Sequence, residues 1–250
     1  MINIKSDREI ELMREAGKML AYVHDEITNF IKAGITTYEI DQFGLKLIKK
    51  MNAIPSFYHL YDFPGNFCIS INDEVIHGIP SKKRYIKDGD LVKVDGGVGY
   101  KGYHSDAART NLVGNVSEEN KLLAERTKQS FFEALKVCIP GNHVNDIGRV
   151  IEDYIEPFGY GIVDEYTGHG IGRAVHEDPD VCNFATVERG PKLRKNMTLA
   201  IEPMINLGTE KVEVDNTNGW TVKTKDGKCS SHYENTIVIT DNGPEILSLQ

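Results

Sequence analysis

The sequence lacks paired cysteines, a long apolar run and an excess of basic residues, and each lack excludes a class of protein. Its four cysteines lie far apart and form no Cys-x-x-Cys pair, which argues against a disulfide scaffold or a thiolate zinc site. No apolar run approaches the ~20 residues of a membrane span, and the first residues do not resemble a secretory signal. The net charge of −8 argues against a broad nucleic-acid surface. We therefore expect a soluble, cytoplasmic protein without specific binding to nucleic acids or membranes.

The 250 residues, with 40% hydrophobic and 26% charged content, suit one large domain or two small ones. Capping-box patterns at Ser6 and Thr36 precede apolar residues at helical spacing, which predicts two helices. Short β-rich runs follow to about residue 110. A third helix is expected from Ser117 and a shorter one after Pro140 and Gly141, before a second β-rich region. The order helix, helix, strands therefore occurs twice.

Two pairs of segments share one offset along the chain. The first pair is IKAGITTYEI and CIPGNHVNDI; the second is IKDGDLVKVD, ending at Asp95, and LRKNMTLAIE, ending at Glu202, and both offsets are 107 residues. Independent segments in a common register suggest duplicated halves, about residues 1–115 and 116–250, within a single catalytic domain. In such halves Asp95 and Glu202 occupy equivalent positions.

A second pair of acids also matches between the halves. HSDAARTNLVG and HYENTIVITDNG align Asp106 with Glu234, each two residues after a histidine. Four carboxylates that converge near a pseudo-two-fold axis could not all stay ionised, because like charges raise each other's pKa. A lone acid in a strand is more often a surface ion pair, but Asp95 and Glu202 lie in apolar sequence, where an unpaired acid is costly. Two divalent ions would balance the four charges, and oxygen ligands with one imidazole suit manganese, iron, cobalt or zinc.

The glycine-rich stretch TGHGIGRAVHEDP, residues 167–179, could be a phosphate loop, a metal site or a tight turn with incidental histidines. It has neither the Gly-x-Gly-x-x-Gly spacing nor the Gly-Lys-Ser/Thr signature of phosphate loops. The zincin pattern also fails, because His176-Glu177 lacks a second histidine four residues after the first. Glycine allows a close backbone approach, through which His169 could reach the metal ions predicted from the acids. His176 would then be free for another role.

The motifs CISINDEVIHGIP, VDGG, GYHSDAART, TGHGIG, AIEP and HYENT occur in this order along the chain. On these motifs the sequence resembles the type I methionine aminopeptidases, in the bacterial form without an N-terminal extension, over essentially its whole length. The resemblance implies the α+β fold called pita-bread. In this fold two pseudo-symmetric helix-helix-strand halves form a curved antiparallel sheet, with helices on its outer face, around a site for two metal ions.

The resemblance also implies a role for each residue of that site. Asp106 and Glu234 would bridge the two ions, Asp95 would chelate one of them, and His169 and Glu202 would complete the other. Glu202 would also be the acid/base that takes the proton of the attacking water and gives it to the leaving amine. A hydroxide held between two metal ions would attack the first peptide carbonyl.

The substrate residues follow from the same resemblance. His77 and His176 match two substrate-facing histidines, His77 on the scissile amide and His176 on its carbonyl oxygen. Phe63, Cys68 and Trp220 match the pocket for the methionine side chain, with Cys68 as an apolar wall because no activating base adjoins it in sequence. The implied function is removal of the N-terminal methionine from nascent proteins when the second residue is small. The implied partners are nascent chains and the ribosome surface, and a monomer is expected.

Two departures from the family pattern concern the surroundings of the site. Asn235 stands where the family usually has histidine after the last glutamate, a change that could retune metal affinity through Glu234. Residues 59–61, His-Leu-Tyr, differ from the aromatic pattern of some members, which leaves the outer pocket lining open. Two alternatives remain: a catalytically inactive pita-bread module that binds peptides, and a Xaa-Pro-type aminopeptidase of the same fold. The first would have lost ligands and the second resembles longer chains.

Overall fold

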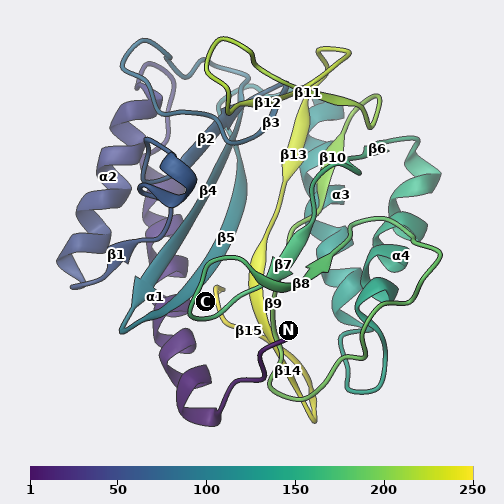
Figure 1. The fold of residues 1–250 in the computed structure, drawn as a ribbon. Helices are drawn as coiled ribbons and strands as arrows, with labels where there is room; N and C mark the ends of the chain where they lie inside the picture. Colours follow the sequence, from purple (N-terminus) through teal and green to yellow (C-terminus); the bar gives the residue numbers. More distant parts are fainter. Residues whose placement is uncertain (250) are drawn as a thin grey trace.

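Two pairs of helices flank the strands of the protein, which a computed structural model describes over residues 1–249 (Figure 1). The first pair is α1 (Asp7–Phe30) and α2 (Thr37–Lys50), and the second is α3 (Glu118–Leu135) and α4 (Val144–Ile155). No helix of the described chain combines the length and the apolar character that crossing a membrane requires.

The helices begin where the sequence predicts. The Ser6 hydroxyl accepts a hydrogen bond from the backbone N–H of Glu9, whose carboxylate accepts from the backbone of Ser6 in return. Thr36 and Glu39 form the same capping box at the start of α2. Ser117 caps α3, its hydroxyl accepting from the third backbone N–H of that helix. These caps satisfy backbone groups that the first helical turn leaves unpaired, and the predicted helix starts are confirmed.

The strand pairs of the described residues are antiparallel throughout. One sheet, before α3, contains β1 (Ile54–Pro55), β2 (Cys68–Ile71), β4 (Leu91–Tyr100) and β5 (Tyr103–Leu112). A five-stranded sheet after α4 has the order β15 (Gly243–Ile246), β14 (Asn235–Thr240), β9 (Thr198–Ile201), β7 (Gly168–Gly170) and β8 (Glu177–Val181). The elongated pair β4 and β5 and the pair β9 and β14 are the main supports of the site described below.

Short strands and turns complete the fold. One three-stranded sheet contains β13 (Ser230–His232), β10 (Met204–Asn206) and β6 (Gly161–Ile162), and another contains β11 (Val212–Val214), β12 (Val222–Thr224) and β3 (Glu74–Ile76). Two 3-10 turns are η1 (Leu60–Asp62) and η2 (Glu156–Phe158). The hairpin of β11 and β12 therefore packs beside β3, which leads to His77.

The parts of the chain before and after α3 meet where β5 passes the start of β14. Glu234 N–H donates to Ala108 O over 3.0 Å, and Ala108 N–H donates back to Glu234 O over 3.3 Å. The backbone N–H of Asp106 donates to the Thr236 hydroxyl at 2.8 Å. The partly buried guanidinium of Arg109 donates to Glu234 O at 2.6 Å. This seam, residues 106–109 against 234–236, holds two of the predicted metal ligands side by side.

Each helix pair packs mainly on its own sheet, and the start of α1 is also buried against Val238 of β14. In one core, residues of α1 and α2 such as Leu20 and Ile48 are buried against β4 residues such as Val94. In another core, residues of α3 and α4 such as Phe131 are buried against β9 and β14 residues such as Ile237. This division between two cores fits the predicted halves, whose duplication stays a prediction.

Candidate active site

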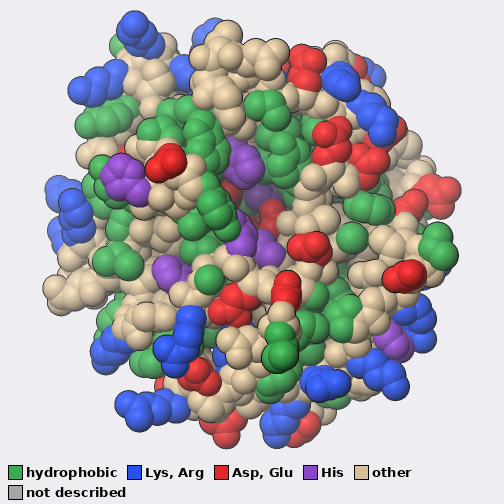
Figure 2. All heavy atoms as spheres, viewed as in Figure 1, with side chains coloured by type: hydrophobic (Ala, Val, Ile, Leu, Met, Phe, Trp, Pro, Cys, Tyr) green, Lys and Arg blue, Asp and Glu red, His purple; other side chains and the backbone are tan. Residues whose placement is uncertain are grey.

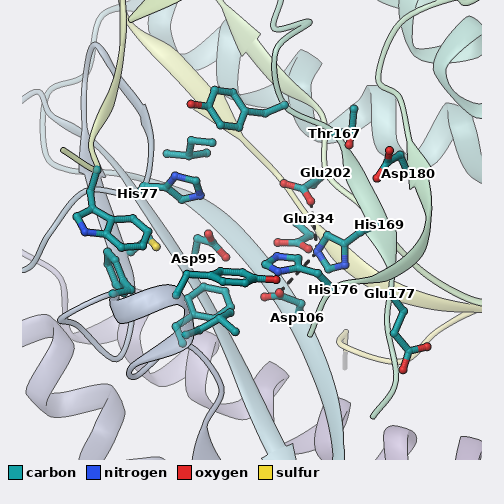
Figure 3. A pocket seen from close by; sticks show the side chains of 18 of the residues that line it. His77, Asp95, Asp106, Thr167, His169, His176, Glu177, Asp180, Glu202 and Glu234 are labelled. Atoms are coloured by element: carbon teal, nitrogen blue, oxygen red, sulfur yellow. Dashed lines mark ion pairs between the residues drawn. The ribbon is translucent and has the colours of Figure 1, made fainter. Parts of the chain in front are cut away.

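The five predicted metal ligands meet at one cavity of about 540 Å³ (Figure 3). Asp95 comes from β4, Asp106 from β5 and His169 from β7, while Glu202 directly follows β9 and Glu234 directly precedes β14. No Lys or Arg is among the described residues that line the cavity. Figure 2 shows acidic and histidine side chains at the hollow of this face, with basic side chains at its periphery. Negative charge is thus concentrated in a cavity that no Lys or Arg side chain lines among the described residues.

The ligand atoms are close enough to share cations. His169 Nε2 lies 3.5 Å from Glu202 Oε1 and 4.0 Å from Asp106 Oδ2. Candidate ligand atoms of Asp106, His169 and Glu234 all lie within 4.8 Å of one another, and so do those of Glu202, His232 and Glu234. Glu234 belongs to both groups, as a carboxylate between two ions would.

Burial makes these acids reluctant to ionise without a cation. It raises the pKa of Asp106 to about 7, even though one oxygen accepts from the Ala107 N–H at 3.0 Å. The pKa values of Asp95, Glu202 and Glu234 are raised well above their ordinary range, first by burial and then by the neighbouring carboxylates. Desolvation and like charge act in the same direction here, so the cluster as a whole needs positive charge.

The donor set fits divalent cations. Asp95 Oδ1 and Glu234 Oε1 are buried and have no hydrogen-bond partner among the described residues. A buried, unpaired carboxylate oxygen is costly, and metal coordination removes that cost. Four carboxylates with an imidazole are the hard-oxygen, single-nitrogen set expected for manganese, iron, cobalt or zinc.

His169 presents the correct nitrogen to the carboxylates. Its Nδ1 lies 2.9 Å from Gly170 O, so the proton resides on Nδ1 and the lone pair on Nε2. Burial lowers the pKa of His169 to about 3, which keeps the imidazole neutral. A neutral ring with a free Nε2 is the form that binds metal ions.

The glycines around His169 allow β7 to pack closely on both sides. A Cβ on Gly168 would lie 2.4 Å from Ala200 O of β9, and a Cβ on Gly170 would lie 2.1 Å from Asp178 O of β8. Both distances are far below van der Waals contact. The glycine-rich sequence therefore serves close strand packing beside His169, as the metal-site interpretation expected.

An apolar pocket adjoins the carboxylates. The rings of Phe63 and Trp220 meet edge to face with centroids 5.2 Å apart. Cys68 is buried in the same cluster and lies opposite Asp95 in the pairing of β2 with β4. Burial, reinforced by Asp95, raises the pKa of the Cys68 thiol well above its ordinary value, so the sulfur is a neutral wall. The three residues predicted for the methionine pocket thus line one cavity with the acids.

The two predicted substrate histidines border the same cavity (Figure 3). The His176 ring lies edge to face with His169 at 4.4 Å between centroids. His77 stands across the cavity, 6.2 Å from the Trp220 ring. Burial lowers the pKa of His77 to about 4 and also lowers the pKa of His176. Both imidazoles are neutral near pH 7 and can each donate one hydrogen bond.

The whole chain is similar to known metallopeptidases. A family model described as metallopeptidase family M24 matches residues 11–241. A methionine aminopeptidase of Clostridium acetobutylicum is 50% identical over 249 residues, which cover 100% of this chain and 99% of that protein. The Escherichia coli (strain K12) methionine aminopeptidase is 39% identical over 250 residues, covering 100% and 94%. The chain belongs to the methionine aminopeptidases of family M24.

Solved structures agree with this assignment. The methionine aminopeptidase from Thermotoga maritima has a TM-score of 0.97 and 40% identity, and the match covers 100% of both chains. The prolidase from Pyrococcus furiosus has a TM-score of 0.80 and 25% identity, and the match covers 99% of this chain but 65% of that one. The predicted pita-bread fold and the predicted membership of the methionine aminopeptidases are confirmed.

The sequence did not identify one histidine that lies beside the carboxylate cluster. His232 Nε2 lies 3.5 Å from Glu202 Oε2, and the ring is 1% exposed. The sequence marks His232 only as the partner of His104 in the alignment of the two acidic motifs. His104 does not line the cavity and instead bonds the Ser56 hydroxyl at 2.8 Å, so that alignment could not identify the useful histidine.

The structure also shows the contacts of the two departures from the family pattern, Asn235 and residues 59–61. The Asn235 amide oxygen accepts from Arg109 at 2.7 Å and from the Ser248 hydroxyl at 3.0 Å. Arg109 also donates to Glu234 O, so Asn235 contacts the side chain that supports the backbone of Glu234. Asn235 itself does not line the cavity. Tyr61 of η1 has left-handed backbone angles, and its ring stacks on His176 at 5.7 Å. Of residues 59–61, Leu60 and Tyr61 line the cavity.

Proposed function

We propose that this M24 chain releases the N-terminal methionine of polypeptides by hydrolysis at a dinuclear metal centre. One observation carries the proposal: a single cavity joins a cluster of buried carboxylates and His169 to an apolar pocket of Phe63, Cys68 and Trp220. The first part suits peptide hydrolysis, and the second suits an unbranched apolar side chain at the first position. We further propose one catalytic unit formed by both halves of the chain.

Five residues would hold the metal ions. These residues would be Asp95, Asp106, His169, Glu202 and Glu234. When bound, divalent ions lower the pKa of a coordinated water and stabilise negative charge on the peptide oxygen. The metal would be manganese, iron, cobalt or zinc, since the donor set suits each of them.

The protein's own groups would move the proton and orient the peptide. Glu202 would take the proton of the attacking water and pass it to the nitrogen of the leaving amine. The neutral His176 would donate a hydrogen bond to the oxygen of the scissile carbonyl, and His77 would bond the scissile amide. Both rings border the cavity, His176 beside His169 and His77 apart from them (Figure 3).

Substrate selection would follow from the shape of the cavity. The methionine thioether would fit among Phe63, Cys68 and Trp220. The second residue would pass between the metal ligands and the two substrate histidines, so only a small side chain would leave the carbonyl in place. A displacement near 1 Å can cost about 100-fold in rate. The substrates would be nascent chains, met at the ribosome surface in the cytoplasm by a monomeric enzyme.

A peptide series tests this function. Purified protein with saturating Mn²⁺ or Co²⁺ is given Met-X-Gly-Gly peptides in which only X varies, and free methionine is measured. Efficient release is expected for X = Ala or Gly, and little for X = Ile or Lys. Equal rates for alanine and isoleucine would refute the size rule. A cut only before proline would favour the Xaa-Pro-type alternative, and no cut at all would favour the inactive binding module.

A further inference from the structure

Glu202 lies between two imidazoles, and only one of them belongs to the predicted ligand set. Its Oε1 is 3.5 Å from His169 Nε2, and its Oε2 is 3.5 Å from His232 Nε2. His232 Nε2 is buried and has no hydrogen-bond partner among the described residues. Buried polar nitrogens are rarely left unpaired, so this nitrogen calls for a partner, and the Glu202 carboxylate is the acceptor in front of it.

The backbone fixes His232 relative to Glu202. His232 pairs with Met204 in the register of β13 and β10, two residues beyond Glu202. The His232 backbone N–H donates to the Thr110 hydroxyl at 3.0 Å, and that hydroxyl donates to His232 O at 2.9 Å. A ring anchored in this way cannot move far from the carboxylate. A separation of 3.5 Å is slightly longer than a hydrogen bond, and such contacts in ligand-free sites tighten in the working complex.

The surroundings of His232 suit a donor. The ring is 1% exposed, and Glu202 Oε2, at 3.5 Å, is the acceptor that faces its unpaired Nε2. A ring N–H that donates to a metal-ligating carboxylate fixes the orientation of that carboxylate.

We propose that His232 is a positioning residue for Glu202, donating its Nε2–H to Oε2 so that Oε1 stays directed at the metal side of the cavity. This rests on the proposed function, in which Glu202 is both ligand and acid/base. His232 would touch neither the substrate nor the metal ions. It would fix which oxygen of Glu202 coordinates and which way the free lone pairs point.

Three variants separate this role from packing. His232→Leu removes the donor, and His232→Gln keeps an N–H near the same place. His104→Gln is the matched control, because His104 precedes Asp106 by two residues as His232 precedes Glu234 but lies outside the cavity. We expect His232→Leu to lower kcat on a Met-Ala peptide by about 10–100-fold with KM nearly unchanged, as loss of an outer partner of a metal ligand does. His232→Gln should recover most of that loss, and the control should match the parent.

Two measurements do not depend on turnover. Calorimetric titration of the metal-free proteins with Mn²⁺ should give weaker binding for His232→Leu by about tenfold, within the range for outer-shell partners, and near-parent binding for His232→Gln. X-ray absorption of the Co²⁺-loaded parent should detect one imidazole ligand for every two cobalt ions. Two imidazoles would make His232 a direct ligand and overturn the proposal.

The remaining outcomes are also decisive. Parent-like kcat and Mn²⁺ affinity in His232→Leu would refute the positioning role. Equal losses in the Leu and Gln variants, together with lower melting temperatures, would reduce His232 to a packing residue. If the metal-loaded parent releases no methionine, the proposed function fails, whereas the Mn²⁺ titrations still test the contact between His232 and Glu202.

Discussion

Single residues of the site differ in what surrounds them. Asp106 receives a hydrogen bond from the Ala107 backbone, whereas Asp95 and Glu234 each keep one buried oxygen without a donor. Glu202 faces a ring nitrogen with each of its oxygens. It also stands at a strand end, directly before Pro203, where its backbone carries little of the sheet. Changing its side chain should therefore affect the chemistry more than the fold.

Glu202→Gln should lower kcat on a Met-Ala peptide by at least about 100-fold, the lower range for losing a general acid/base. The amide can neither accept the water proton nor coordinate as a carboxylate does. The far-UV circular dichroism spectrum should match that of the parent. Release of free methionine is measured at saturating metal, and near-normal turnover there would remove Glu202 from the role proposed for it.

The buried His24, which does not line the cavity, leads us to expect an effect of pH on the stability of the fold. Its buried ring lies against Ala107 O at 2.9 Å, and burial lowers its pKa to about 3. An unfolded histidine titrates near ~6.5. Between these pH values the unfolded chain binds a proton at His24 and the folded protein does not. The free energy of unfolding is therefore highest above about pH 6.5 and falls as the pH decreases towards 3.

The variant His24→Gln lacks this titration. The free energy of unfolding of the parent, relative to His24→Gln, should fall by about 1.4 kcal/mol per pH unit below about pH 6. Urea unfolding at pH 7 and pH 5, with chelator present so that metal binding does not contribute, gives the comparison. His59→Gln, at an exposed position, should parallel the parent. Parallel profiles for His24→Gln and the parent would contradict the prediction.

At the scale of elements, local sequence predicted what local forces determine. The starts of α1 and α2 follow from capping boxes, each of which spans only four residues, and these starts are confirmed. The place of His232 depends on the pairing of β13 with β10, which joins residues far apart in the chain. No spacing pattern encodes that register. Tyr61 reaches His176 only because η1 adopts left-handed angles, which its own residue type does not suggest.

The ligand residues were easier to predict than the elements that hold them. Asp95 and Glu202 stand in apolar strand sequence at an offset of 107 residues that another pair of segments repeats, so their burial could be foreseen. Their roles stay predictions until metal is bound. Asn235 differs: its side chain turns to Arg109 and Ser248, and Arg109 in turn donates to the backbone oxygen of Glu234. A sequence change beside a ligand does not reveal which way the side chain points.

Strand β7 should tolerate no side chain at Gly170. Gly170→Ala would place a Cβ 2.1 Å from Asp178 O, so β7 and β8 must separate. We expect a loss of roughly 1–3 kcal/mol in the free energy of unfolding, as for other overpacked sites, and weaker Mn²⁺ binding because His169 is the next residue. Denaturant unfolding and calorimetry measure the two effects. Val187→Ala, at a fully exposed position, is the control, and parent-like values for Gly170→Ala would be inconsistent with the close packing.

On the scale of the whole molecule, the metal site draws on both parts of the chain. Asp95 and Asp106 precede α3, while His169, Glu202 and Glu234 follow it. Bound cations would therefore join the two parts in addition to the hydrogen bonds of the seam. Without them, four buried acids with raised pKa values face one another.

Removal of metal should inactivate the protein reversibly and lower its stability. A cation whose free concentration is 100 times its Kd stabilises the folded state by about 2.7 kcal/mol. Chelation removes this stabilisation. Melting temperatures and methionine release are compared before chelation, after it, and after Mn²⁺ is restored. Elemental analysis confirms that the metal is gone. Full activity in metal-free protein would rule out a metallopeptidase mechanism for this chain.

The seam between β5 and β14 has a further consequence for how the molecule comes apart. Each helix pair packs mainly on its own sheet, and beyond the seam the start of α1 also packs on Val238 and Leu247. Separation of residues 106–109 from 234–236 would therefore break the contacts of one helix end and leave most helical contacts in place. It would, however, pull Asp106 away from Glu202 and break the coordination of any ion that is bound by residues on both sides of the seam. During slow denaturation, a fluorescent indicator in the solvent should therefore report escaping cations while the circular dichroism of the helices is still intact.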